Sequence, residues 1–505
     1  QSVGSIATLS ILVGVMPLLT AQMQTMAEVV FIVTGGHSTR GMGVFFCAVL
    51  ICFTLFFGTR QRNNRGLSHD GLVVAIAAES LIKLIAMLAI SAYAYFSVLG
   101  GEQGLNQWLQ NNPAALEQMY QPLQGGYWHS LLLLFFFAAV VVPCMYQMAF
   151  TENREPRDLV TASWGVPLYF LLMAIGIPIL LWAGQALQLS LPTTYYGLGI
   201  ALQANSPWMT LILFVGTLAA SSGILIVTTL ALANMLLNHI LLPISGLSTD
   251  DNLYQRTLNQ QRLLIAFIPT AAFLLAWLPT LRPDSTEMSM LSFVATIQLA
   301  PSMLALLFWP RATGMGVLIG LSAGILVWFV TLVLPAFFVP ELDTSAWLGL
   351  DVNDQLGHWQ AMGLIATLAN IGCMLAFSLL TKQSADDKEI AEACSVDNLR
   401  SPLRWGLIAD STSAFIEALS PSLGPITAER EVKMALQDLG LKLDERRPYA
   451  LRRLREQLNA NLSGLLGPSM AQDLLDEHLP HKIVAHAPGD DIHYIELRLE
   501  EYRDK

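Results

Sequence analysis

Long apolar runs recur along the chain between Ser5 and Leu380, and they restrict its fold more than any other feature of the sequence. Each run has at least about 18 residues, which is enough for an α-helix to cross a bilayer. An open sheet would leave backbone groups unpaired in lipid, and barrel strands are much shorter, so we expect helices. Only 13% of the 505 residues are charged, which excludes a single soluble domain.

The apolar runs predict ten membrane-spanning helices and an all-α, polytopic fold. The expected spans are 5–33, 41–59, 71–98, 127–149, 162–186, 207–243, 262–280, 287–309, 313–338 and 359–381. The connections after every second span hold eight arginines, against two in the opposite connections. The eight are Arg60, Arg62, Arg65, Arg154, Arg157, Arg256, Arg262 and Arg311, and the two are Arg40 and Arg282. By the positive-inside rule, residue 1 and the tail after Lys382 are expected in the cytoplasm.

The charge balance limits the expected partners. The formal net charge is −11 and the sequence has no basic stripe that could neutralise phosphates, so nucleic acid is excluded. The five cysteines are scattered without a metal-binding spacing, which predicts ordinary apolar packing. No charged segment precedes the first apolar run, so we expect no signal peptide and regard the sequence as part of a longer protein.

Beyond Lys382 the sequence becomes charged and amphipathic. Stretches near 410–419, 427–439, 447–466 and 470–479 predict a cytoplasmic four-helix domain at 383–488. Ser420-Pro421 and Gly424-Pro425 are expected to separate the first two helices, and Gly440 to end the second. In residues 489–505 the apolar spacing of three and four fits either the start of a coiled-coil signalling helix or an amphipathic tail.

Two spans contain features that a simple membrane anchor does not need. Pro143 interrupts the fourth span, which indicates either a plain kink or a broken helix beside a midplane site. The sixth span carries Ala219, Ser221 and Ser222. Such small residues favour close helix packing, although hydroxyls near freed carbonyls also suit a hard cation such as sodium.

Other spans carry charged and amide side chains. Glu79 and Lys83 are spaced i,i+4 and are expected to form a structural ion pair, with a proton or substrate site as the alternative. Polar residues also follow Pro17 in the first span and precede Pro301 in the eighth, and a shared hydrophilic cavity would give them partners. They are Gln22, Gln24, Thr25 and Gln298. The glycines of the ninth span, from Gly314 to Gly324, predict tight helix packing.

Several segments resemble a known family. The segment FWPRATGMGVLIGLSAGILVW at 308–328 resembles a signature-like helix of the sodium/solute symporters, the family of the proline and sugar symporters. Residues 58–84 and 148–172, with the QxQ pattern of Gln22 and Gln24, are similar to symporter-like sensor histidine kinases that respond to carbon sources. The segment REQLNANLSGLLGPSMAQDLL at 455–475 is similar to the STAC domain, which links such transporters to kinases of two-component systems.

The resemblance implies a LeuT-like inverted-repeat fold of thirteen helices, of which residues 1–382 would form helices four to thirteen. It also implies a sodium site at Ala219, Ser221 and Ser222. The implied substrate cavity is lined by Gln22, Gln24, Thr25, Pro143, Tyr146 and Gln298. Neighbouring branches of the family suggest histidine or acetate as the nutrient, with sodium or protons as the coupling ion.

Two functions are consistent with these features. In the first, the chain is the sensory module of a two-component sensor histidine kinase in the bacterial inner membrane. It binds and transports a small nutrient and signals to a kinase domain beyond Lys505, which phosphorylates a response regulator. In the second, the chain is a plain sodium-coupled transporter with a regulatory tail. The sequence has no phosphate loop and no phosphoacceptor histidine box, so enzyme activity would belong to the longer protein. Its histidines near the tail, at 478, 481, 486 and 493, are expected at the surface.

Overall fold

The computed structural model of the chain describes most of its residues. The described residues are 2–36, 39–58, 61–63, 66–68, 70–115, 127–153, 156–245, 253–277, 284–339, 342, 344, 355–384, 387, 391, 406–409, 411–442, 448–466 and 468–482. They fold almost entirely into helices and form two compact units. The first unit comprises Gln1–Gln61, Ser68–Leu241 and Leu258–Asn398, and the second comprises Arg62–Leu67, Leu242–Thr257 and Leu399–Lys505. The expected coiled coil at 489–505 lies outside the described residues.

The long helices fall where the apolar runs predict them. In chain order the helices before residue 400 are α1 (Ser2–Val33), α2 (Thr39–Gly58), α3 (Asp70–Tyr93), α4 (Gly101–Asn111), α6 (Tyr127–Val141), α7 (Pro143–Tyr146), α8 (Pro156–Ala186), α9 (Tyr196–Gln203), α10 (Pro207–Leu236), α11 (Leu242–Ser245), α12 (Leu253–Ala276), α13 (Ser285–Ile297), α14 (Ala300–Phe308), α15 (Gly314–Trp328), α16 (Leu334–Phe337) and α18 (Gln355–Leu380). Short π-helical turns follow four of them, at η1 (Ala94–Val98), η2 (Gln147–Thr151), η4 (Leu237–Leu241) and η5 (Phe329–Val333). A 3₁₀ turn, η3 (Thr193–Tyr195), precedes α9, and β1 (Gln61–Asn63) pairs with β2 (Gly66–Ser68).

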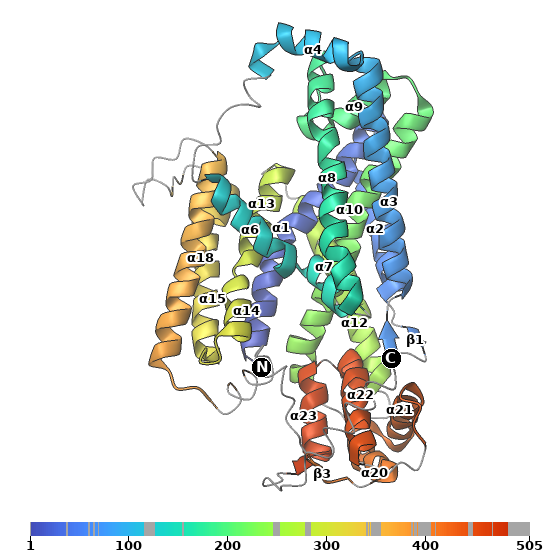
Figure 1. The fold of residues 1–505 in the computed structure, drawn as a ribbon, viewed down its shortest axis with the longest axis vertical. Helices are drawn as coiled ribbons and strands as arrows, with labels where there is room; N and C mark the ends of the chain where they lie inside the picture. The colour runs from blue at the N-terminus through green and yellow to red at the C-terminus, as the bar shows by residue number, and fades with distance from the viewer. Residues whose placement is uncertain are drawn as a thin grey trace. The chain divides into compact units, whose positions relative to one another are not determined.

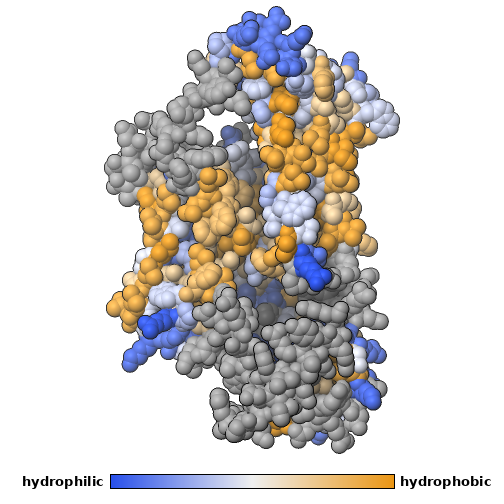
Figure 2. Space-filling view, in the orientation of Figure 1, coloured by the Kyte–Doolittle hydropathy of each residue, from blue (hydrophilic) through white to orange (hydrophobic). Residues whose placement is uncertain are grey.

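Eight helical segments in the described part of the chain are long and apolar enough to span a membrane, and a ninth, Gly41–Phe56, is apolar but shorter. The remaining predicted span, the fourth at 127–149, is divided between α6 and α7, because the helix is interrupted at Val142. This pattern is that of a polytopic membrane protein. Figure 2 shows the corresponding apolar surface over the long helices, with hydrophilic residues gathered on α4.

The first unit contains two groups of helices with α1 between them. One buried core joins α6, α13, α15 and α18, and includes Leu291, Trp328 and Met362. A second core joins α3, α8, α9 and α10, and includes Ile90 and Ile200. Helix α1 packs against α13 of the first group and α10 of the second, so its residues contact both (Figure 1).

Glycines bring α15 and α18 together, as the spacing of the ninth span predicted. A methyl group at Gly316 would lie 2.0 Å from Ser378 Oγ, and one at Gly320 would lie 2.7 Å from Met374 Cβ. Larger residues at either position would therefore force the helices apart. Thr313 begins α15 by accepting a hydrogen bond from the Gly316 amide, at 3.1 Å.

The second unit contains four helices close to the predicted stretches. They are α20 (Thr412–Leu423), α21 (Pro425–Asp438), α22 (Pro448–Leu466) and α23 (Pro468–His478), and β3 (Gly406–Leu407) pairs antiparallel with β4 (His481–Lys482). The prediction that Pro421 ends the first helix is wrong, because α20 continues through it to Leu423. The break comes at Gly424, whose φ of 79° a residue with a side chain rarely adopts. Gly440 ends α21 as predicted, with φ of 64°, while Leu441 N–H donates to the Leu436 carbonyl.

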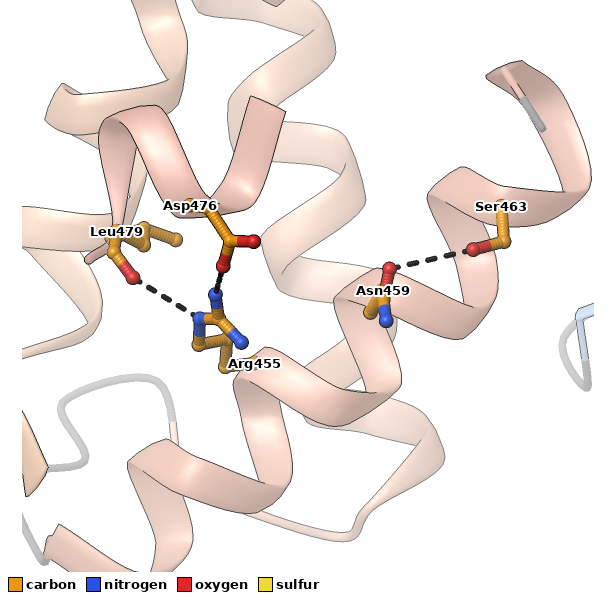
Figure 3. A network of polar contacts seen from close by, with 5 residues as sticks. All are labelled: Arg455, Asn459, Ser463, Asp476 and Leu479. Carbon is orange, nitrogen blue, oxygen red and sulfur yellow. Dashed lines mark hydrogen bonds and ion pairs between the residues drawn. The ribbon is translucent and has the colours of Figure 1, made fainter. Parts of the chain in front are cut away.

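Arg455 joins α22 to the end of α23. Its guanidinium donates to Asp476 Oδ1 at 2.5 Å and to the Leu479 carbonyl at 3.1 Å (Figure 3). A cation at this position stabilises the carbonyl end of a helix. On the same helix Ser463 donates to Asn459 Oδ1 at 3.4 Å. His478 is half-buried, and its Nε2 is hydrogen-bonded to Ser422 Oγ at 2.6 Å.

Candidate functional site

Helix α1 contains Pro17 near its middle and continues through it. Proline has no N–H and displaces the preceding turn, which frees backbone groups inside the apolar region. The next amide, that of Leu18, donates to Ser292 Oγ of α13 at 2.9 Å. One turn earlier, a methyl at Gly14 would lie 2.6 Å from Ala295 Cβ, so α1 and α13 are in close contact here. The segment of α1 after Pro17 is thus fixed to α13 by Ser292, a residue that the sequence analysis did not predict to be important.

The predicted cavity residues of α1 lie beyond Pro17. Gln22 and Gln24 are half-buried, and neither side chain is hydrogen-bonded to another described residue. Thr25 and Glu28 lie beside the hydroxyl of Tyr195, a buried residue of η3. Burial and the Glu28 carboxylate raise the pKa of Tyr195. Tyr195 was not predicted, because it lies in a polar connection and only the fold brings it to α1.

The fourth predicted span is a broken helix rather than a kinked one. Val142 is extended, with ψ of 129°, and Pro143 starts α7. Pro143 is buried, whereas Tyr146 is 49% exposed and its ring packs against Phe150. The side chain that lies toward α10 is Cys144, whose thiol is beside Thr228. The predicted pair of Pro143 and Tyr146 therefore has one member inside the packed helices and one at their surface.

Thr228 of α10 has no exposed surface, and the only partner of its hydroxyl among the described residues is the Cys144 thiol, which is a weak donor and acceptor. Seven residues earlier on the same helix lies Ser221, which is 2% exposed. Residues seven apart share a helix face, so both hydroxyls lie on the side of α10 that packs toward α1 and α7. An unpartnered hydroxyl inside an apolar bundle costs about 1–3 kcal/mol unless another group binds it.

The other two predicted cation-binding residues have a different environment. Ser222 Oγ donates to the Ala219 carbonyl at 3.0 Å, so the hydroxyl and that carbonyl already satisfy each other within α10. Of the three predicted residues, Ser221 therefore has the hydroxyl that is freest to bind an ion. Among the described residues no group of three or more His, Cys, Asp or Glu side chains is arranged around a metal. Hydroxyl and carbonyl oxygens are the donors that remain, and they suit a hard cation.

Glu79 and Lys83 form an ion pair on α3, with 2.7 Å between Oε1 and Nζ. Their side chains are 11% and 21% exposed, respectively. The carboxylate lies directly against Gly223 of α10, where a methyl group would be 1.9 Å from Glu79 Oε2. The ion pair thus adjoins the small-residue segment that contains Ser221 and Ser222. The importance of Gly223 could not be read from the sequence, since it depends on how α3 and α10 pair.

Gln298 lies where α13 ends and α14 begins, and it is fully buried. Its side-chain Nε2 donates to Thr367 Oγ1 at 3.2 Å. Its backbone carbonyl accepts a hydrogen bond from Asn370 Nδ2 at 2.6 Å. Gly324 leaves room for its side chain, since a methyl there would be 2.4 Å from Gln298 Oε1. The side chain is therefore bonded to α18 within its own helix group. The structure brings Gln298 together with Thr367 and Asn370, and among the described residues Gln298 has no hydrogen bond to Gln22 or Pro143.

Polar groups also fix the start of α1 to η4, the turn that follows α10. At the start of α1, Ser5 Oγ donates to the His239 carbonyl and Thr8 Oγ1 is bonded to His239 Nδ1, both at 2.8 Å. His239 lies in η4, a π-helical turn, and such turns are frequent at functional sites.

Comparison of the chain with protein-family models and with curated proteins gave no match.

Proposed function

We propose that the chain is the transporter-like sensory module of a two-component sensor histidine kinase in the bacterial inner membrane. The proposal includes the LeuT-like inverted-repeat fold that the sequence resemblance implies. The observation that supports it most is the interruption between α6 and α7, after which the Cys144 thiol of α7 is the only, weak partner of the buried Thr228 hydroxyl among the described residues. Broken helices beside buried polar groups are how transporters build sites at the middle of the membrane.

In this proposal a sodium ion binds at the face of α10 that carries Ser221 and Thr228. Sodium is a hard cation and prefers oxygen donors. Ser221 Oγ and Thr228 Oγ1 would supply hydroxyls, and Ser222 and Ala219 would contribute only if their mutual hydrogen bond opened. The ion would thereby satisfy the buried Thr228 oxygen. Protons are the alternative coupling ion, since hydroxyls alone do not distinguish sodium coupling from proton coupling of the whole protein.

The nutrient would bind between α1 and the α6–α7 interruption. Gln22, Gln24 and Thr25 would supply amide and hydroxyl groups, and the extended backbone at Val142 would supply further ones. Histidine or acetate fits the resemblance, because either needs a few polar partners in an otherwise apolar site. Gln298 would act indirectly in this scheme, through the contact between α13 and α1.

Signalling would pass from the spans to the cytoplasmic helices α20–α23, and from there to a kinase domain and a response regulator. The four helices pack as a bundle around buried residues such as Phe415, Leu454 and Leu475. A plain sodium-coupled transporter with a regulatory tail is the second candidate. The presence of a separate helical unit favours the sensor, because transport alone does not need one.

Two measurements separate these candidates. The reading frame of the gene past the Lys505 codon should continue into a dimerisation helix with a His-Glu box and an ATP-binding domain, and a stop codon there refutes the sensor. Binding of radiolabelled histidine and acetate to the purified protein should reveal one of them as a ligand. If neither binds in the presence or absence of sodium, and a panel of other amino acids and short carboxylates also fails, the nutrient site is refuted.

A further inference from the structure

A long apolar cavity of about 410 Å³ lies between α6, α14 and α18, and no residue of α1 or α10 lines it. On α18 its wall runs from Gln360 to Leu375, which is roughly 22 Å at 1.5 Å per residue. On the facing side it runs from Ile297 to Trp309, and Leu133 and Phe137 of α6 cover part of it. The cavity is therefore a narrow groove that follows two membrane helices for most of their length.

The wall of this groove offers little to a polar ligand. Thr367 is one of its few polar residues, and its hydroxyl is already used, because it donates to the Gly363 carbonyl at 2.8 Å and accepts from Gln298 at 3.2 Å. Ala305, which is 5% exposed, and Gly363 keep the groove open because they have small side chains or none. An extended hydrocarbon chain matches this surface, whereas an amino acid or a short carboxylate does not.

Basic residues lie at the end of the groove where α14 and α18 both end. Arg311 follows Trp309 by two residues, and Lys382 lies about two helical turns beyond Leu375. Both are exposed, and in the described part of the chain neither forms an ion pair. Among the described residues near Lys382, Asp387 is acidic, but its carboxylate accepts from the Ser384 amide at 3.2 Å and lies against Gly314 at the start of α15.

The backbone at this end is held in place. Gln383 Nε2 donates to the Pro310 carbonyl at 2.6 Å, and the hydroxyls of Thr313 and Thr381 are 2.8 Å apart. The loop that carries Arg311 is thereby tied to the segment that carries Lys382. Arg311 follows Trp309 by two residues, and Trp309 lies at the border between apolar and polar residues, which is where tryptophan is enriched in membrane proteins.

We propose that this groove binds one acyl chain of an anionic phospholipid from the leaflet at which α14 and α18 end, with the lipid phosphate held by Arg311 and Lys382. The charge of the two basic residues selects an anionic headgroup over a zwitterionic one. The length and the apolar wall of the groove select a chain rather than a free phosphate. This site is independent of the nutrient and sodium sites.

The test uses the purified full-length chain, stripped of lipid in detergent and then mixed with phosphatidylglycerol or phosphatidylcholine, with bound lipid counted by native mass spectrometry. Ala305→Phe should fill the groove and abolish retention of phosphatidylglycerol. Leu306→Phe is the matched control, because Leu306 is the next residue, is 40% exposed and does not line the groove. Arg311→Gln and Lys382→Gln should each reduce the preference for phosphatidylglycerol about fivefold, while Arg157→Gln on α8 should leave it unchanged.

The proposal is overturned if Ala305→Phe and Leu306→Phe retain equal amounts of lipid, or if the wild type binds the two lipids equally. Inorganic phosphate should not displace the bound lipid, and displacement would show that an anion site without a chain site is present. A photoreactive acyl chain on phosphatidylglycerol gives a readout that needs no variant. It should label the α18 peptide at groove residues such as Thr367 and Ile371, and labelling only at the exposed Leu368 contradicts the assignment.

Discussion

Replacing Gly223 with alanine should destabilise the protein through the Glu79–Lys83 pair. The added methyl would lie 1.9 Å from Glu79 Oε2 and 2.3 Å from its Cδ, so the carboxylate must move. Helix α10 cannot withdraw from α3 without losing the close packing at Gly216 as well, where a methyl would be 2.7 Å from Ala86 Cβ. If the carboxylate moves, the 2.7 Å contact with Lys83 is lost. Overpacking costs about 1–3 kcal/mol, and we expect about 2 kcal/mol in total.

The assay is reversible unfolding of the purified full-length chain in one detergent, with Gly372→Ala as the matched control. Gly372 lies in α18 with nothing within 4 Å of an added methyl, so alanine there should be neutral or stabilising by up to about 1 kcal/mol. In a background of Glu79→Ala and Lys83→Ala, Gly223→Ala should cost less than about 0.5 kcal/mol. The reasoning is refuted if Gly223→Ala has its full cost in that background, or if it behaves like Gly372→Ala in the wild type.

Three further predictions concern the ion pair, the second unit and the orientation. Lys83→Ala should cost about 2 kcal/mol more than the double replacement of Glu79 and Lys83, because it leaves a largely buried carboxylate alone, and equal unfolding free energies would mean that the residues do not pair. Burial raises the pKa of Asp438, an effect that the nearby Asn461 side chain opposes, so this group favours folding at low pH and its contribution falls as pH rises above the ordinary value of 3.8. Asp438→Asn should therefore slow hydrogen exchange in α21 at pH 7 relative to the wild type, and an unchanged exchange rate contradicts this. In a variant without native cysteines, a cysteine at Gln110 should react with an impermeant reagent from outside and one at Ser384 should not, and the reverse pattern refutes the topology.

Hydropathy predicted the positions of the long helices because each must be apolar over its whole length in lipid. Pro143 marked the position of the interruption, since proline removes a backbone donor wherever the helix lies. The sequence left open whether the helix is kinked or broken there. The four helices of the second unit followed from their spacing of apolar residues. Pro421 was wrongly predicted to end α20, because the last turn of a helix can accept proline when a residue such as Gly424 ends the helix two residues later.

Tertiary pairing limited what the sequence could predict about the site. Gly223 matters because the Glu79 carboxylate packs on it, and Gln298 is bonded to Asn370, a residue 72 positions away. Neither contact can be predicted from the neighbouring sequence, because a polar residue in a span gives the same sequence pattern whether it faces a cavity or another helix. Ser221 and Ser222 are adjacent in sequence, but only the structure separates the hydroxyl bonded to Ala219 from the one on the face of Thr228.

Sodium dependence of ligand binding tests the proposed function most directly. The assay is equilibrium binding of radiolabelled histidine and acetate to the purified full-length chain, with sodium varied at constant ionic strength, for the wild type and for Ser221→Ala and Thr228→Val. We predict that sodium increases the affinity of the wild type for one of the two ligands. Both variants should need at least about tenfold more sodium for the same affinity, because each loses one oxygen donor. Sodium-independent binding by the wild type, or an unchanged sodium requirement in both variants, would contradict the sodium site on α10.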